Sequence, residues 1–400
     1  MKQKVLLAFS GGLDTSYCVK YLKHEKGLEV HSALVNTGGF SPRELESIEE
    51  KAHYLGAESH QTLEETQVYY EQIVRFLIYG NILKNGNYPL SVSAERLHQA
   101  VALAREARRL GVQYIAHGST GAGNDQVRFD LVFRLLIPDI EILSPIRDLQ
   151  VSRSQEIDFL KSHGVDINWQ KAQYSINKGL WGTSIGGAET LTSHQQLPEE
   201  AYPSQLKKEA PEIVQLHFKK GELQGLNNDI IAPVDAILEL DQKASKYAIG
   251  RDTHVGDTII GIKGRVGFEA AAAHIIIKAH HALEKHTLSK WQLHWKQQLA
   301  DWYGMFLHEA QFFDPVMRDI EGFLSSSQST VSGKVAIKLL PYRFEVVGIE
   351  SPNDLMQSDF GLYGEAHSQW NGEDVRGFTK ILSNAMKINH SVNGSLKSFI

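Results

Sequence analysis

The sequence has few of the features that mark several large classes of protein. Cys18 is its single cysteine among 400 residues, so an internal disulfide is excluded and a reducing compartment, the cytoplasm, is expected. The apolar run at residues 5–9 is too short for a signal-peptide core. Residues 270–279 are interrupted by His274 and Lys278, which excludes a membrane span there. No membrane partner is therefore expected.

Excess positive charge is also missing. The formal net charge is −6, whereas a nucleic-acid-binding protein normally carries a basic domain or stripe, so no nucleic-acid partner is expected. With 42% hydrophobic and 22% charged residues, the composition is that of a globular soluble protein. Four hundred residues are too many for one core, so at least two domains are expected.

A glycine-containing loop near the start of the chain is the strongest local signal. An apolar strand at residues 5–9 runs into Ser10-Gly11-Gly12, and a helix follows from about Thr15. Such a junction offers unpaired amides and the positive end of a helix dipole, which suits a phosphate. Ser10, Thr15 and Ser16 add hydroxyl donors. A tight strand-to-helix turn without a ligand is the alternative, and the Walker motif is absent from the whole sequence.

Strands and helices alternate over the first half of the chain. Strands are expected at residues 5–9, 29–36, 58–62, 114–117 and 141–143, with helices between them, including one at 94–110. Capping boxes start further helices at Ser41 and Ser152. This order predicts an α/β fold with a doubly wound parallel sheet. Its ligands should lie beyond the carboxyl ends of the strands.

The second half is expected to be an α+β domain followed by a helical tail. Residues 173–203 are expected to form loops. After them, strands are expected at 213–218, 258–262, 334–340 and 344–349, and helices at 272–286 and 290–312. The predicted domains are 1–168, 169–360 and 361–400. The tail, with a helix near 374–386, should dock on a neighbouring subunit.

Two side-chain groups in this half invite a structural interpretation. Trp291, Trp295 and Trp302 fall at helical spacing and are expected in the core or at a subunit interface. His280 and His281 lack the spacing of a metal site, and no metal-ligating residues are predicted anywhere in the chain.

A second glycine-rich loop, residues 118–125, follows the strand expected at 114–117. Asn124 and Arg128 share one face of the next helix, and Asp125 lies on the adjoining face. Arg128 is suited to a carboxylate and Asp125 to an ammonium, so together they favour a zwitterionic amino acid. A helix cap plus a surface salt bridge explains the same residues equally well.

The motifs resemble those of a known family. Ser-Gly-Gly-Leu-Asp-Thr-Ser at residues 10–16 resembles the PP-loop of the N-type ATP pyrophosphatases, which cleave ATP between its α- and β-phosphates. Together with residues 117–130, Tyr174-Ser175-Ile176, Leu180-Trp181, Ser184 and Gly250-Arg251-Asp252, it is similar to the signature of argininosuccinate synthases. The resemblance implies a nucleotide-binding α/β domain, a synthetase domain and a C-terminal helix used in a homotetramer.

The implied reaction joins citrulline to aspartate through a citrullyl-adenylate, converts ATP to AMP and pyrophosphate, and uses Mg²⁺. Asp14, Asn124 and Asp125 are the expected catalytic residues. The residues implied for ATP are Ala8, Phe9, Ser10, Gly11, Gly12, Leu13, Asp14, Thr15, Ser16, Val35 and Gly118. Those implied for aspartate are Thr120, Asn124 and Asp125. Those implied for citrulline are Tyr88, Ser93, Asn124, Arg128, Ser175 and Ser184.

The chain departs from the family pattern at three positions. Ala122 stands where many relatives have lysine, Gly256 replaces a glutamate that contacts citrulline, and Phe268 replaces a citrulline-binding tyrosine. Loss of a carboxylate and a hydroxyl should weaken binding of a free α-amino acid at least tenfold, unless Asp257 compensates. A second hypothesis is an α-N-acylated citrulline, whose neutral amide does not need the lost carboxylate. Free citrulline is the first expectation.

Two other functions fit the first loop. PP-loop enzymes that transfer sulfur or use a glutaminase domain need catalytic cysteines, which one cysteine does not supply. A non-catalytic sensor of adenine nucleotides needs only the first loop, and it leaves Asn124, Asp125 and Arg128 without a task.

Overall fold

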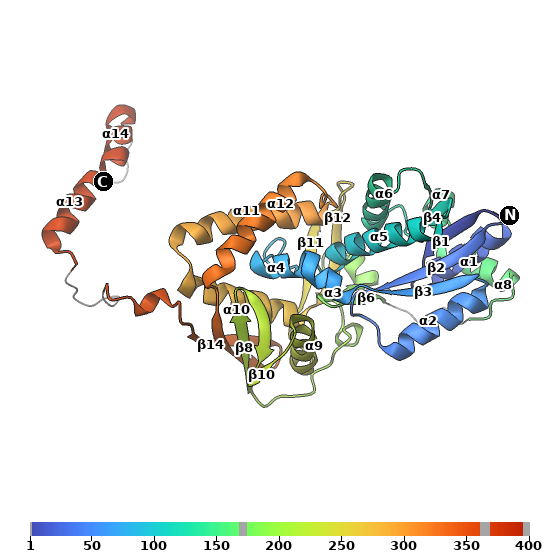
Figure 1. Cartoon of the computed structure of the whole chain (residues 1–400), viewed down its shortest axis with the longest axis horizontal. Coiled ribbons are helices and arrows are strands. Elements are labelled where there is room, and N and C mark those ends of the chain that lie inside the picture. Colours follow the sequence, from blue (N-terminus) through green and yellow to red (C-terminus); the bar gives the residue numbers. More distant parts are fainter. Residues whose placement is uncertain (1, 168–173, 361–368, 395–400) are drawn as a thin grey trace. The chain divides into compact units, whose positions relative to one another are not determined.

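A parallel five-stranded sheet organises the first half of the chain in the computed structural model, which describes residues 2–167, 174–360 and 369–394 (Figure 1). The strand order is β3-β2-β1-β4-β5, and every neighbouring pair is parallel. The order reverses between β1 and β4, so the carboxyl ends of these two strands form a switch point where ligands bind. The predicted α/β class is confirmed. The strands are β1 (Lys4–Ala8), β2 (Glu29–Asn36), β3 (Ser59–Glu64), β4 (Tyr114–Ala116) and β5 (Glu141–Leu143).

Helices cover both faces of this sheet. Val5 and Leu7 pack with Cys18 in one cluster, whereas Leu6, between them in the sequence, packs in the other, because neighbouring strand residues point to opposite faces. Cys18 is fully buried, as expected of a packed residue. One face carries α1 (Leu13–His24), α2 (Pro42–Leu55), α7 (Pro145–Leu149) and α8 (Arg153–Ser162), and the other carries α5 (Ser91–Leu110) and α6 (Asp125–Leu136).

Local sequence signals set several helix boundaries. Ser41 and Ser152 form the predicted capping boxes with Glu44 and Gln155. Between β3 and α5 the chain forms α3 (Thr66–Tyr69), a π-helical turn (Tyr70–Val74) and α4 (Arg75–Tyr79). These buried aromatic segments belong to the core that continues into the second half of the chain.

The second half of the chain contains a four-stranded antiparallel sheet with the strand order β11-β12-β7-β6. Two sequence predictions were wrong here. The expected loop at 173–203 contains the hairpin of β6 (Ser175–Gly179) and β7 (Gly182–Gly186), and the expected strand at 258–262 is the turn between β11 (Arg251–Asp257) and β12 (Lys263–Glu269). Ile260 and Ile262 are exposed in that turn, so their apolar character does not mark a core strand.

A second antiparallel sheet, β10-β9-β8-β13-β14, packs against long helices in the same unit (Figure 1). Its strands are β8 (Glu212–Lys219), β9 (Glu222–Leu226), β10 (Asp229–Ile230), β13 (Gly333–Leu340) and β14 (Arg343–Glu350). The helices are α9 (Pro233–Ala244), α10 (Ala271–Thr287), α11 (Lys290–His308) and α12 (Pro315–Ser327). Trp291, Trp295 and Trp302 of α11 are more than half exposed, so the expected core position is wrong and the interface position stays a prediction.

The chain divides into two compact units, Met1–Asn353 and Asp354–Ile400. The second unit contains α13 (Gly372–Leu382) and α14 (Asn384–Asn393), where one helix near 374–386 was predicted. The expected domain limits at 168/169 and 360/361 involve residues 168, 169 and 361, which lie outside the described residues, and they stay predictions. None of the described helices combines the length and apolar character needed to cross a bilayer.

A charged network lies buried in the second half of the first unit. The Glu284 carboxylate is 3.0 Å from Lys296 Nζ and accepts hydrogen bonds from Asn81 and Gln328. His280 lies one turn away, and burial lowers its pKa to about 4. His280 therefore acts as a neutral packing residue, whose single N–H donates to the amide oxygen of either Asn81 or Gln328. Among the described residues, no three His, Cys, Asp or Glu side chains converge as a metal site.

We expect Glu284→Ala to destabilise the protein by roughly 3–5 kcal/mol, because it leaves Lys296 buried without its carboxylate. The measurement is the midpoint of thermal unfolding. Glu239→Ala is the matched control, because Glu239 forms a partly exposed helical pair with Lys243. This substitution should cost about 0.5 kcal/mol. Equal losses in the two variants would contradict the assigned role of the network.

Candidate active site

A cavity of about 1620 Å³ opens at the carboxyl ends of β1 and β4, where the two glycine-rich loops leave the sheet. It brings together most of the residues predicted from sequence. Those that line it are Ala8, Phe9, Ser10, Gly12, Leu13, Asp14, Thr15, Val35, Tyr88, Ser93, Gly118, Thr120, Asn124, Asp125, Arg128, Ser175, Ser184 and Gly256. Gly11, Ser16 and Phe268 do not line it.

The first loop has the backbone conformation that a phosphate site requires. Gly11 has a φ of +75°, a conformation that favours glycine. Gly12 is the N-cap of α1, and no side chain in the described structure caps this helix. The first-turn amides and the positive end of the helix dipole therefore remain available for an anion. Ser16 is buried, and its hydroxyl donates to the Gly12 carbonyl at 2.7 Å, which fixes the loop from behind.

Two carboxyl groups meet below this loop. Asp14 lines the cavity, and its side chain hydrogen-bonds Glu156 of α8. Burial, together with the charge of Asp14, raises the pKa of Glu156 to about 8. Glu156 is therefore mainly protonated at pH 7, so its carboxyl group adds no full negative charge beside Asp14.

The second loop is fixed to the turn between β11 and β12. Asn124 is the N-cap of α6, but its side chain does not cap that helix. Its Oδ1 accepts a hydrogen bond from the Ile259 amide at 2.8 Å instead. The turn that was wrongly predicted to be a strand thus holds one of the predicted site residues in place.

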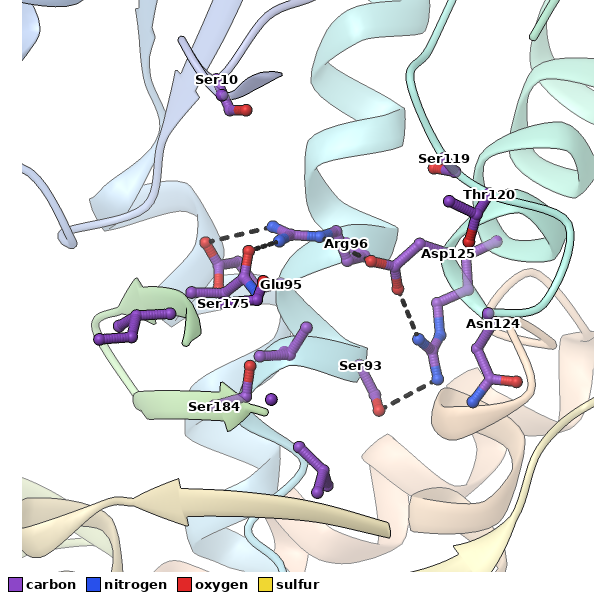
Figure 2. Close-up of a pocket in the computed structure, with 18 of the residues that line it drawn as sticks. Ser10, Ser93, Glu95, Arg96, Ser119, Thr120, Asn124, Asp125, Ser175 and Ser184 are labelled. Carbon is purple, nitrogen blue, oxygen red and sulfur yellow. Dashed lines mark hydrogen bonds and ion pairs between the residues drawn. The ribbon is translucent and has the colours of Figure 1, made fainter. Parts of the chain in front are cut away.

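Asp125 lies between two arginines, which we call the Arg96–Asp125–Arg128 array (Figure 2). Arg96 Nε donates to one carboxylate oxygen at 3.1 Å, and Arg128 Nη1 donates to the other at 3.0 Å. Burial alone would raise the pKa of Asp125, but the two guanidinium groups outweigh it and hold the pKa below its ordinary value. Asp125 is therefore a carboxylate that carries charge at all physiological pH values.

Arg128 links this array to the second half of the first unit. It is buried, and Nη2 donates to Ser93 Oγ at 3.1 Å and to the His308 carbonyl at 3.0 Å. The alternative that Arg128 forms a salt bridge on the protein surface is therefore wrong, because its side chain is buried. Burial and the charge of Arg128 lower the pKa of His308 to about 3, so its imidazole is neutral.

Glu95 and Arg96 are functional candidates that sequence reasoning missed. Glu95 is buried, and its carboxylate accepts hydrogen bonds from Thr37 Oγ1 at 2.6 Å and from Gln99 at 2.9 Å. Burial raises its pKa above the ordinary value. Arg96 also donates to Asn177 of β6 at 2.6 Å. A signal was present: Arg96 follows the predicted residue Ser93 by three positions, so the two share a helix face.

The end of the cavity that is formed by the four-stranded β11-β12-β7-β6 sheet is aromatic. Tyr88 stacks on His254, with ring centroids 4.9 Å apart, and contacts Phe268 at 5.4 Å. Phe268 is fully buried beneath this pair, which explains why it does not line the cavity. Burial and the charge of Lys84 lower the pKa of His254, so this ring is also neutral.

Comparison with protein-family models identifies the family of the chain. Residues 4–166 match the model described as "Arginosuccinate synthase N-terminal HUP domain", and residues 174–389 match "Arginosuccinate synthase C-terminal domain". The chain belongs to the argininosuccinate synthase family.

Curated members of the argininosuccinate synthase family resemble this chain over almost its full length. The argininosuccinate synthase of Dictyoglomus thermophilum is 37% identical, over 95% of this chain and 96% of its own. The argininosuccinate synthase of Methanocaldococcus jannaschii is 35% identical, over 91% of this chain and 93% of its own. That of Xanthomonas campestris is also 35% identical, over 97% of this chain and 98% of its own. The predicted family and, with it, the ATP-dependent ligase class are confirmed.

We expect Glu156→Gln to change how stability depends on pH. The raised pKa of Glu156 contributes stability that is fully present below about pH 4.5 and is lost as the pH rises through about 8. Glutamine stays neutral throughout. The free energy of unfolding of the variant, relative to that of the natural protein, should therefore rise from pH 5 to pH 8 by at most about 1.4 kcal/mol per pH unit, as measured by denaturant unfolding at each pH.

Asp158→Asn is the control for this series, because Asp158 lies on the same helix and is exposed. Its difference from the natural protein should not change with pH. A flat profile for Glu156→Gln as well would contradict the raised pKa of Glu156.

Proposed function

We propose that this chain joins citrulline to aspartate by way of a citrullyl-adenylate, with ATP bound at residues 8–16, Val35 and Gly118. The observation that carries the proposal is that the uncapped phosphate loop and the Arg96–Asp125–Arg128 array line the same cavity. The loop suits a polyphosphate, and the array with its neighbouring hydroxyls and amides suits amino acids. A site for a nucleotide alone would not need the array.

In the first step the ureido oxygen of citrulline attacks the α-phosphorus of ATP, and the bond to the bridging oxygen of the β-phosphate breaks. Pyrophosphate leaves with that electron pair. Its negative charge lies against the amides that start α1 and the hydroxyls of Ser10 and Thr15, so the leaving group is stabilised where its charge develops.

In the second step the α-amine of aspartate attacks the former ureido carbon and AMP leaves, while the surplus protons of the amine pass to a phosphate oxygen or to water. Thr120, Asn124 and Asp125 are the proposed aspartate residues. Ser93, Arg128, Ser175 and Ser184 are proposed to hold citrulline with Tyr88. None of them needs to act as a nucleophile, because orienting bound reactants supplies roughly 7–11 kcal/mol at best.

The residues present fit a Mg²⁺ ion at the phosphate loop. Asp14 offers an oxygen ligand on the cavity wall, beside the uncapped start of α1 where the phosphates are proposed to lie. Asp14 would hold the ion together with phosphate oxygens. When bound, Mg²⁺ would neutralise charge on the departing pyrophosphate.

Cys18 supports this proposal over sulfur transfer. It is fully buried, and burial raises the pKa of its thiol well above the ordinary value. A sulfur carrier needs an accessible thiolate.

The proposal includes a cytoplasmic homotetramer without nucleic-acid or membrane partners, built from the domains predicted at 1–168, 169–360 and 361–400. Support for assembly comes from α13 and α14. Their apolar side chains Phe378, Ile381, Met386 and Val392 are all more than half exposed. Short helices that leave such side chains in water gain stability when a second surface covers them.

The test of the proposed reaction follows the ureido oxygen. With ATP, Mg²⁺, aspartate and citrulline labelled with ¹⁸O in its ureido group, mass spectrometry should find the label in AMP. Asp14→Asn should lower kcat about 100-fold, the usual cost of losing one charge-stabilising group. Asp158→Asn is the matched control and should keep the natural rate. Unlabelled AMP, or no AMP at all, would refute the adenylate.

The test of assembly replaces Phe378 and Ile381 by aspartate. Light scattering should give four times the chain mass of 44.8 kDa for the natural protein and a smaller mass for this variant. Lys380→Glu, a charge change on the same helix, should leave the mass unchanged. If the double variant stays tetrameric, α13 is not the assembly element.

A further inference from the structure

The imidazole of His308 contacts two of the residues that are proposed to hold citrulline. His308 is the last residue of α11, its side chain is buried, and it lines the cavity. Its Nδ1 lies 3.0 Å from Ser93 Oγ and 3.4 Å from Arg128 Nη2. Neither step of the proposed reaction uses this ring, so its place beside Ser93 and Arg128 calls for a role of its own.

The charge of Arg128 decides which ring nitrogen of His308 carries a hydrogen. Burial and this charge lower the pKa of His308 to about 3, so the ring is neutral and has a single N–H. A guanidinium has only donors, so a hydrogen on Nδ1 would point toward the hydrogens of a cation. The backbone of Asp257 favours a ring N–H by hydrogen bonding. We therefore assign the hydrogen to Nε2 and leave Nδ1 as an acceptor.

This assignment fixes the direction of the Ser93 hydroxyl group. Ser93 Oγ accepts a hydrogen bond from Arg128 Nη2 at 3.1 Å, and its own hydrogen is donated to Nδ1 of His308. A hydroxyl group has one hydrogen and two lone pairs. Ser93 lines the cavity, and one lone pair is all that it has left for a ligand. It can therefore accept a hydrogen bond from a ligand but cannot donate one.

Arg128 does not depend on the imidazole for its own position. Its Nε and Nη2 donate to the backbone carbonyl of His308 at 3.2 and 3.0 Å, and its Nη1 donates to Asp125 at 3.0 Å. A substitution of the His308 side chain leaves all three acceptors in place. Such a substitution therefore removes the partner of the Ser93 hydroxyl without releasing the guanidinium.

We propose that His308 is a positioning residue that makes the Ser93 hydroxyl a hydrogen-bond acceptor for an N–H group of citrulline. The inference rests on the proposed function and deepens it, because it gives a role in substrate recognition to a residue outside the predicted site. Citrulline has N–H groups in its α-ammonium and its ureido group. With the opposite tautomer, Ser93 would donate instead and would suit the carboxylate or the ureido oxygen. The imidazole thus determines which part of the substrate Ser93 recognises.

The first experiment compares His308→Leu with His308→Asn by the rate of AMP release. Leucine fills a similar volume without an acceptor, whereas asparagine keeps an acceptor oxygen close to the backbone. His308→Leu should raise KM for citrulline about tenfold, because the buried Ser93 hydroxyl loses its partner, and should change KM for ATP and for aspartate less than about twofold. His308→Asn should keep KM for citrulline within about threefold of the natural value.

His294→Leu is the matched control, because His294 lies on the same helix and is exposed. It should leave all three KM values unchanged. Equal losses in His308→Leu and His308→Asn would assign the imidazole to packing alone and overturn the proposal. A rise of all three KM values in His308→Leu would overturn it as well.

The second experiment tests whether His308 acts through Ser93. Ser93→Ala removes the hydroxyl group, so adding His308→Leu to it should change KM for citrulline by less than about twofold. If the two effects multiply instead, the positioning role is wrong while the proposed function stands. Absence of AMP release by the natural protein with ATP, Mg²⁺, aspartate and citrulline overturns the proposed function and this inference together.

A substrate analogue identifies the N–H group that Ser93 meets. 5-Ureidopentanoate lacks the α-nitrogen of citrulline and keeps its carboxylate and ureido group. If Ser93 accepts from the α-ammonium, His308→Leu should no longer raise KM when this analogue replaces citrulline. If Ser93 accepts from the ureido group, the rise of about tenfold should persist with the analogue.

Discussion

The carboxylate of Asp125, held between Arg96 and Arg128, is the interaction on which the site depends. It joins α5 to α6, and its arginines extend the connection to Asn177 on β6 and to the His308 carbonyl at the end of α11. Within the Arg96–Asp125–Arg128 array, two cations around one anion leave a positive surplus, which the neutral imidazole of His308 does not cancel. Such a surplus favours ligands that bring negative charge.

The β6–β7 hairpin connects this array to the nucleotide side of the cavity. The Leu180 amide at its turn donates to the Thr37 carbonyl at 2.9 Å, and the Thr37 hydroxyl donates to Glu95. Gly179 leaves no room for a side chain, because an added Cβ would lie 2.7 Å from the Glu95 carboxylate. These contacts therefore fix the positions of the loop after β2, the β6–β7 hairpin and α5 relative to one another.

The sequence predicted those parts of the fold whose side chains meet a core. The parallel strands, the capping boxes and the helices at 94–110 and 272–286 follow from apolar periodicity and local caps. The β6–β7 hairpin was missed because one of its faces lines a cavity, so its Ser, Asn and Gly residues lack the apolar alternation of a core strand. The turn at 258–262 was misread for the opposite reason, since its isoleucines lie in solvent.

The sequence predicted those parts of the candidate site that lie within local motifs. Both loops and the residues within them line one cavity, because parallel strands bring their carboxyl ends to one edge. Contacts between distant segments left no local signal. Neither the bond from Ile259 to Asn124 nor the stacking of His254 on Tyr88 could be found from residue spacing, because each joins elements more than a hundred residues apart.

The core has a consequence for motion between the two halves of the first unit. Leu6 and Val35 of the parallel sheet belong to the same buried cluster as Leu216 and Val335 of the second antiparallel sheet. Helix α5, roughly 30 Å long by its 20 residues, contacts elements on both sides. Swinging one half of this unit against the other would tear apolar packing along that whole length. A hinge motion between the two halves would therefore cost the free energy of every apolar contact that it separates.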